Sequence, residues 1–147
     1  MNVREVMTSK VVTCNADARL DTVAMMMWDN DCGSIPVIDQ SQKPIGIVTD
    51  RDIAMGAALQ HKALWDIVAQ DVTNNRPIHT CIADVDVASA LKMMQSQRIR
   101  RLPVVNGTGQ LVGIVSLDDI VALAQKTGAE LSFDDAMTTL KAVCKHH

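Results

Sequence analysis

The chain contains 147 residues, of which 48% are hydrophobic and 21% charged, and its formal net charge is −3. These values are typical of a folded globular protein and argue against a disordered chain. Aromatic residues make up only 2% and acidic groups outnumber basic ones, so neither stacking platforms nor a broad basic surface for nucleic acid is expected.

The first predicted elements are a strand, a helix and a hairpin. A short strand is expected over Val11–Thr13. Apolar residues then recur with the spacing of an amphipathic helix: Leu20, Val23, Ala24 and Met27. The stretches "SIPVID" and "PIGIV", separated by a polar turn, predict the two strands of a hairpin. A closing helix is expected over Asp50–Leu59.

A connecting segment follows this helix. The sequence "QHKALWDIVAQDV" places Leu64, Ile67 and Val68 at helical spacing. We expect a connecting helix that packs on the part of the chain that follows it.

The second half of the chain repeats the first at a constant offset of 67 residues, the distance from Gly46 to Gly113. The same elements are predicted again: a strand over Ile78–Cys81, an amphipathic helix, the strands "RLPVVN" and "LVGIV", and a helix over Leu117–Lys126. The fold class is therefore α+β, with two tandem β-α-β-β-α repeats. We expect a first repeat at 1–60, the connecting helix and second repeat at 61–127, and a helical tail at 128–147.

Each copy places a hydroxyl residue three positions before an aspartate where the closing helix begins. These are Thr49 and Asp52 in "GIVTDRDI", and Ser116 and Asp119 in "GIVSLDDI". The spacing predicts a capping box, in which side chains and backbone bond reciprocally. A hydroxyl, a carboxylate and free N–H groups at a helix start also suit a nucleotide. The motif alone leaves both interpretations open.

The repeated elements, with "VREVMTSKVVT", "SIPVID", "GIVTDRDI" and their second-copy partners, resemble the tandem cystathionine β-synthase (CBS) domain pair, or Bateman module, over residues 3–126. The resemblance implies two repeats packed about a pseudo-twofold axis, with two clefts that take adenosine-containing ligands. It also implies a sensor rather than an enzyme. The second copy departs from the family pattern where "DVTNNRP" replaces "VMT".

By this resemblance, each cleft combines the helix-start motif of one repeat with strands of the other. The first predicted nucleotide-binding site comprises Thr49, Arg51, Asp52, His79, Thr80, Arg100, Arg101, Leu102 and Pro103. The second comprises Val12, Thr13, Ser34, Ile35, Pro36, Ser116 and Asp119. The aspartates are expected to accept hydrogen bonds from ribose hydroxyls, while the hydroxyl residues and the helix-start N–H groups contact phosphate.

The two clefts are expected to differ in charge. The repeat aligns Gly33 and Ser34 with Arg100 and Arg101, and guanidinium groups bind phosphate through paired N–H donors. The first site should therefore prefer AMP, ADP or ATP, whereas the second could accept an uncharged adenosyl group. His79 could contact the base, although a lone histidine in a strand is more often structural.

These observations predict a stand-alone regulatory module that binds adenine nucleotides and requires no cofactor. It is not expected to be an enzyme, because the sequence offers no nucleophile paired with a base and no metal-binding cluster. Two alternatives stay open: a structural oligomerisation module without a nucleotide ligand, and a binder of another adenosyl ligand such as S-adenosylmethionine. A target protein is expected, but the sequence does not identify it.

The chain is expected to be a cytoplasmic homodimer. Its four cysteines lack disulfide or metal spacing, and its N-terminal residues do not resemble a secretion signal. No apolar run approaches the roughly 18 residues of a membrane span. An apolar stripe in the tail predicts a helix-mediated dimer: Leu131, Met137, Leu140, Val143 and Cys144. His146 and His147, beside Cys144, are not expected to bind a metal.

Overall fold

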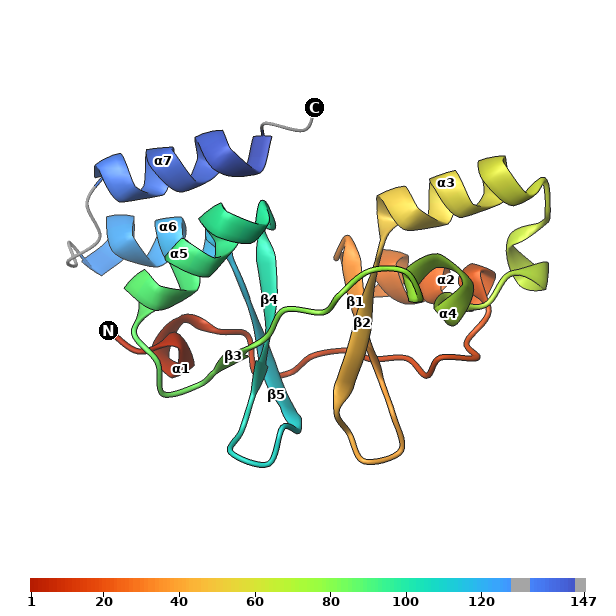
Figure 1. Cartoon of the computed structure of the whole chain (residues 1–147), viewed down its shortest axis with the longest axis horizontal. Helices are drawn as coiled ribbons and strands as arrows, with labels where there is room; N and C mark the ends of the chain where they lie inside the picture. The colour runs from red at the N-terminus through yellow and green to blue at the C-terminus, as the bar shows by residue number, and fades with distance from the viewer. Residues whose placement is uncertain (128–132, 145–147) are drawn as a thin grey trace. The chain divides into compact units, whose positions relative to one another are not determined.

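A computed structural model describes residues 1–127 and 133–144 of the chain (Figure 1). The chain forms two compact units, each with its own small sheet and helices. Unit 1 comprises Met1–Lys10, His79–Thr108 and the chain from Val112 onward, and unit 2 comprises Val11–Ile78 and Gly109–Leu111.

Unit 2 is built on an antiparallel hairpin of β1 (Ser34–Ile38) and β2 (Pro44–Thr49). Pro36 lies opposite Ile47 in the register. The N–H of Cys14 donates to the Pro36 carbonyl over 3.0 Å, so that Cys14 forms a parallel bridge with the strand. This single bridge replaces the strand predicted over Val11–Thr13.

Two helices cover this hairpin at the predicted places, α2 (Leu20–Asp29) and α3 (Asp50–Gln60). The apolar residues that predicted α2 face inward, with Leu20 and Val23 fully buried. Together with β1 and β2 they form one hydrophobic core. Burial of this apolar stripe is what stabilises a helix of this length, because short helices are marginal in water.

The connecting segment differs from the prediction. It forms a short 3-10 helix, η1 (Leu64–Asp66), and a short α4 (Ala69–Thr73) rather than one helix. Its backbone bonds to the first repeat, since Leu20 donates to the Ile67 carbonyl over 2.9 Å and Ala69 donates to the Ala18 carbonyl over 2.8 Å. Ile67 and Ala69 are fully buried in the core of unit 2. The segment therefore packs on the first repeat, not on the second.

Unit 1 contains the sheet β3 (Cys81–Ile82), β4 (Arg101–Val105) and β5 (Leu111–Ser116), in the order β3-β4-β5. Cys81 lies opposite Val104 in a parallel pair, and these residues are the repeat counterparts of Cys14 and Val37 in unit 2. Both repeats thus pair equivalent positions, as their common sequence pattern predicts. The opening strand of the second repeat is limited to β3.

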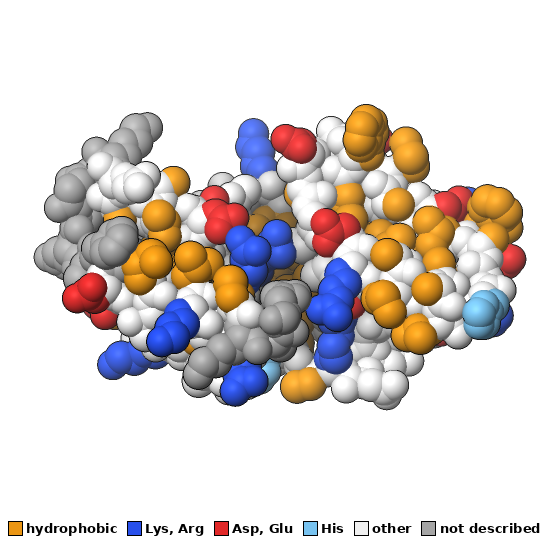
Figure 2. Space-filling view, turned by 90° about the horizontal axis from the view of Figure 1, so that it is seen from above, with side chains coloured by type: hydrophobic (Ala, Val, Ile, Leu, Met, Phe, Trp, Pro, Cys, Tyr) orange, Lys and Arg blue, Asp and Glu red, His pale blue; other side chains and the backbone are white. Residues whose placement is uncertain are grey.

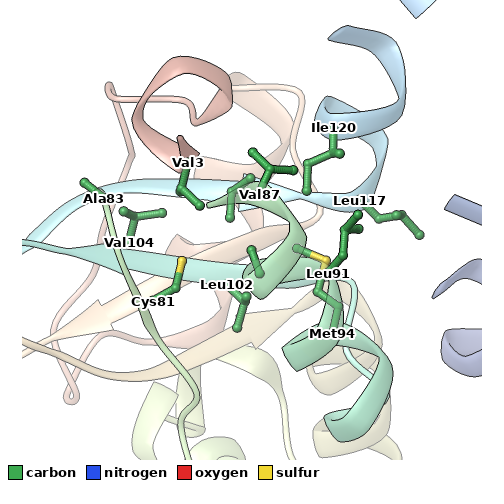
Figure 3. Close-up of a cluster of buried hydrophobic side chains, with 12 residues drawn as sticks. Val3, Cys81, Ala83, Val87, Leu91, Met94, Leu102, Val104, Leu117 and Ile120 are labelled. Carbon is green, nitrogen blue, oxygen red and sulfur yellow. The ribbon is translucent and has the colours of Figure 1, made fainter. Parts of the chain in front are cut away.

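The core of unit 1 also includes the N-terminus of the chain. Helix α5 (Val87–Gln97), helix α6 (Leu117–Thr127) and β4 pack against Val3 of α1 (Val3–Val6) (Figure 3). Val3 is fully buried. The first residues of the chain therefore pack on the second repeat, just as α4 packs on the first.

Helix α7 (Phe133–Val143), in the predicted tail, packs on α5 (Figure 1). Thr139 and Val143 are buried, whereas Met137 and Leu140 are exposed. Val143 is thus turned into the chain's own core and cannot contribute to the apolar stripe predicted for dimerisation. Leu131, His146 and His147 lie outside the described residues.

Candidate functional site

The first helix-start motif forms the predicted capping box at the start of α3. The Asp52 N–H donates to Thr49 Oγ1 over 3.2 Å, and the Thr49 N–H donates to Asp52 Oδ2 over 2.8 Å. Ser34 lies opposite Thr49 in the register of β1 and β2. The motif therefore places a hydroxyl and a partly buried carboxylate together, where a strand ends and a helix begins.

The second motif has the same geometry at the start of α6. The Asp119 N–H donates to Ser116 Oγ over 3.1 Å, and the Ser116 N–H donates to Asp119 Oδ2 over 3.2 Å. The capping interpretation thus holds in both copies. Within the described residues, the hydrogen bonds to both carboxylates use only Oδ2, which leaves Oδ1 as an acceptor for a ligand hydroxyl.

The backbone N–H groups at the start of α3 are already bonded, unlike the free N–H groups expected from the sequence. The Asp50 N–H donates to the Gly33 carbonyl, and the Arg51 N–H donates to Asp50 Oδ1. The Asp52 N–H is held by the capping box. A phosphate at this motif would therefore depend on side-chain donors more than on the helix backbone.

Arg76 is a functional candidate that the sequence reasoning missed. Its Nη2 donates to Asp52 Oδ2 over 2.8 Å, and the Asp52 side chain is only 15% exposed. The same nitrogen also donates to the carbonyls of Ile47 and Val72. The available signal was the stretch "DVTNNRP", which departs from the family pattern and contains this arginine.

Arg100 lies beside the second motif within unit 1. Its carbonyl accepts the Leu117 N–H over 2.9 Å, and its Nη2 lies 3.2 Å from Asp118 Oδ1. Both side chains of this ion pair are largely exposed, so the pair contributes little to stability. Arg101 is the first residue of β4 and is partly buried.

The remaining predicted site residues differ in what they can offer a ligand. Ile35 and Leu102 are fully buried in the two cores, and the prolines beside them are also buried. A ligand could therefore meet only their backbone: Ile35, Pro36, Leu102 and Pro103. Four others are partly buried: Val12, Thr13, His79 and Thr80. The polar side chains of the last three make no hydrogen bond within the described residues. The Arg51 side chain is exposed.

Each predicted site combines residues of both units, and these combinations stay predictions. Within unit 2, Ser34, Thr49 and Asp52 come together with Arg76. Within unit 1, Ser116 and Asp119 lie at the helix start beside Arg100. In the described part of the chain, no three acidic, cysteine or histidine side chains form a metal-binding cluster. None of the helices in residues 1–127 and 133–144 is long and apolar enough to span a membrane.

Two curated relatives match most of this chain. The uncharacterized protein MK0525 of Methanopyrus kandleri is 33% identical over 82% of the chain, which spans 61% of that protein. A homoserine O-acetyltransferase of Methanococcoides burtonii is 34% identical over 81% of the chain, which spans only 23% of the enzyme. The similarity thus concerns a part of longer proteins.

Solved structures share the fold. The CBS domain protein TA0289 of Thermoplasma acidophilum has a TM-score of 0.80 at 23% identity and covers 97% of this chain and 75% of its own. The CBS domain pair of MJ0100, in complex with 5′-methylthioadenosine and S-adenosyl-L-methionine, has a TM-score of 0.75 at 25% identity over 86% of this chain and 97% of its own. CBSX2 in complex with AMP has a TM-score of 0.72 at 22% identity over 87% of this chain and 98% of its own.

The sequence profile of the CBS domain matches this chain twice. The matched ranges are residues 3–57 and 68–126, and each includes one hydroxyl–aspartate capping box at the end of a buried strand. The chain therefore belongs to the CBS domain family and contains a tandem pair of these domains.

Proposed function

We propose that this chain is a regulatory module that binds adenine nucleotides at its two helix-start motifs. The observation that carries the proposal is the duplicated capping box, in which Asp52 and Asp119 each keep one carboxylate oxygen outside the box. A carboxylate oxygen accepts hydrogen bonds from paired hydroxyls such as those of ribose. Capping alone requires only the oxygen that is already engaged.

AMP, ADP and ATP are the proposed ligands, and no cofactor is proposed. Support comes from CBSX2, which shares the fold and is known in complex with AMP. A second candidate is S-adenosylmethionine or a related adenosyl compound, because the MJ0100 pair is in complex with two such ligands. A module without any ligand, serving oligomerisation alone, is the third possibility that the experiment below distinguishes.

We propose that the module regulates rather than catalyses. In the homoserine O-acetyltransferase, this chain corresponds to less than a quarter of the enzyme, so the catalytic activity named there need not reside in the matched part. The ligand would act on a target protein by binding two states of the module unequally, since only differential affinity shifts an equilibrium. We also propose a cytoplasmic homodimer.

The proposal is tested by isothermal titration calorimetry on Asp52→Asn, Asp119→Asn and the double variant. Loss of charge-assisted hydrogen bonds to ribose should weaken nucleotide binding at the altered motif by about 10- to 150-fold. Asp50→Asn is the matched control, because Asp50 is an exposed carboxylate in the first turn of the same helix. Unchanged affinity in the double variant would return both motifs to a purely structural role.

Ligand identity is decided by thermal unfolding with a panel of AMP, ADP, ATP, S-adenosylmethionine and adenosine. A ligand present at about 100 times its dissociation constant should stabilise the fold by roughly 2.7 kcal/mol. A shift with S-adenosylmethionine but not with nucleotides would favour the second candidate. No shift with any of the five would favour the oligomerisation module.

A further inference from the structure

The two helix-start motifs differ in the arginine that accompanies them. In unit 2, Arg76 Nη2 pairs with Asp52, the carboxylate of the capping box. In unit 1, Arg100 pairs with Asp118, one position before the capping aspartate. Asp119 has no arginine partner within the described residues. The carboxylate proposed to accept ribose is therefore charge-neutralised in the first motif only.

The strand before each motif also has a different hydrogen-bond partner in the two repeats. Ile114, on β5, exchanges two backbone hydrogen bonds with Thr8, at 2.8 and 3.0 Å. Ile47 is the repeat counterpart of Ile114, and its carbonyl instead accepts Arg76 Nη2 over 3.1 Å. An arginine side chain thus occupies, in the first repeat, the position that a backbone bridge fills in the second.

The guanidinium of Arg76 has donors to spare. All three of its hydrogen bonds use Nη2, so Nε and Nη1 make none within the described residues. The side chain is 49% exposed, and five N–H donors in a planar fork suit the oxygens of a phosphate. The three acceptors hold Nη2 in place, and the Nε and Nη1 donors of Arg76 are left for a ligand.

We propose that Arg76 binds the ligand phosphate at the first motif, in addition to the arginines predicted for that site, and strengthens its preference for phosphorylated adenosine ligands. This inference rests on the proposed function. The backbone N–H groups at the start of α3 are already bonded, so the phosphate requires a side-chain cation. Arg76 also offsets the negative charge of Asp52, which would otherwise repel an anionic ligand.

The experiment compares AMP with adenosine, which lacks the phosphate. Calorimetry is performed on the full chain carrying Asp119→Asn, so that the first motif is measured without the second. Arg76→Gln is then added. AMP affinity should fall by about 10-fold or more, whereas adenosine affinity should change little. Arg76→Lys should restore part of the preference for AMP, because it keeps the charge but loses the fork.

Two controls separate phosphate binding from a structural role. Arg19→Gln removes an exposed arginine of the same unit that pairs with Asp21 and belongs to neither predicted site, so the ratio of AMP to adenosine affinity should stay unchanged. Arg76→Gln in a chain carrying Asp52→Asn, where only the second motif is intact, should also leave that ratio unchanged. The ratio is insensitive to a general loss of stability, which thermal unfolding measures separately.

An equal loss of AMP and adenosine affinity in Arg76→Gln, or no loss of either, would overturn the assignment of Arg76. The proposed function fails differently. In that case the unsubstituted chain would bind neither AMP nor adenosine, or the Asp52→Asn, Asp119→Asn double variant would keep the affinity of the unsubstituted chain.

Discussion

Trp28 and Gln95 occupy equivalent positions in the two repeats, but Gln95 bonds to another helix, α7, whereas Trp28 is exposed. The Gln95 amide donates to Thr139 Oγ1 of α7 over 2.8 Å. Trp28, by contrast, is 82% exposed. Figure 2 shows hydrophobic side chains gathered on the side of the view where α3 lies in Figure 1. Helices α2 and α3 carry further exposed hydrophobic side chains: Met25 on α2, and Met55 and Leu59 on α3. Among the described residues, the helical face around Trp28 in the first repeat is thus exposed, whereas α7 covers its counterpart in the second.

We expect this α2/α3 face to form the interface of the proposed homodimer. A groove of about 430 Å³ lies between the two helices and is lined by Trp28, Met27 and Ile53 among others. Exposed apolar patches of this kind mark association surfaces. Trp28→Gln, which introduces the residue that the second repeat carries, should convert the dimer to a monomer in light scattering at micromolar concentration.

The control for this substitution is Trp65→Gln, because Trp65 is also largely exposed but lies on η1. In a Trp65→Phe chain, Trp28 is the sole tryptophan, and its emission should shift to shorter wavelength as concentration increases. A chain that is monomeric before any substitution, or a Trp28→Gln variant that stays dimeric, would contradict the assignment of this face.

Helix α7 should depend on its hydroxyl contact with α5. Thr139 is fully buried, and its hydroxyl donates to the Asp135 carbonyl while accepting from Gln95. Thr139→Val keeps the shape but leaves the Gln95 amide without this acceptor, which should cost about 1 to 3 kcal/mol of unfolding free energy. Hydrogen exchange of the α7 amides should accelerate. Thr138→Val, at an exposed position of the same helix, should have little effect on either measurement.

The glycine of β5 is required because the N-terminal segment passes close to it. A Cβ atom at Gly113 would lie 2.8 Å from the Thr8 carbonyl oxygen, which is held by the Ile114 N–H. The backbone cannot move away without losing this pairing. Gly113→Ala should therefore lower the unfolding free energy by about 1 to 3 kcal/mol. Gly107→Ala, with no atom within 4 Å of the added carbon, should be nearly neutral in the same urea titration.

The repeats could be predicted from the sequence because local and global signals agree. The closing helices were expected to begin at Asp50 and Leu117, where the structure begins them, since the hydroxyl cap and the preceding apolar strand both specify that boundary. The docking of the connecting segment could not be predicted in this way. The periodicity of this segment indicates that Ile67 is buried, but it does not indicate in which of the two cores. The choice of core depends on backbone hydrogen bonds to residues far away in the sequence.

The candidate site was predicted only in part for a similar reason. Sequence spacing identified Asp52 and Asp119, because the capping box is a local structure. Arg76 lies 24 residues from its partner Asp52, and no local pattern connects them. The family pattern likewise could not indicate that the first N–H groups of α3 donate to the Gly33 carbonyl and to the Asp50 side chain. The first of these bonds depends on the path of the loop before β1, and the second depends on the rotamer of Asp50.

The two buried thiols, Cys14 and Cys81, are repeat counterparts and should make stability depend on pH. Burial raises the pKa of each from an ordinary value of 9.0 to about 11. Between these values the unfolded chain releases thiol protons that the folded chain retains, so the unfolded state binds fewer protons and stability falls as pH increases. The slope should reach about 1.4 kcal/mol per pH unit for each thiol. Well below pH 9 the thiols are neutral in both states and contribute no slope.

Urea denaturation at intervals between about pH 8 and pH 10.5, under reducing conditions, measures this slope directly, because ionisation is linked to unfolding. Cys14→Ala with Cys81→Ala should lower stability at pH 8, because each leaves a small cavity, yet give a shallower decline towards pH 10.5. The matched control is Cys32→Ala with Cys144→Ala, since both of those thiols are exposed. Other groups that titrate in this range affect all three chains alike. An equal slope in the buried-thiol variant and the control would mean that burial does not hold these two protons.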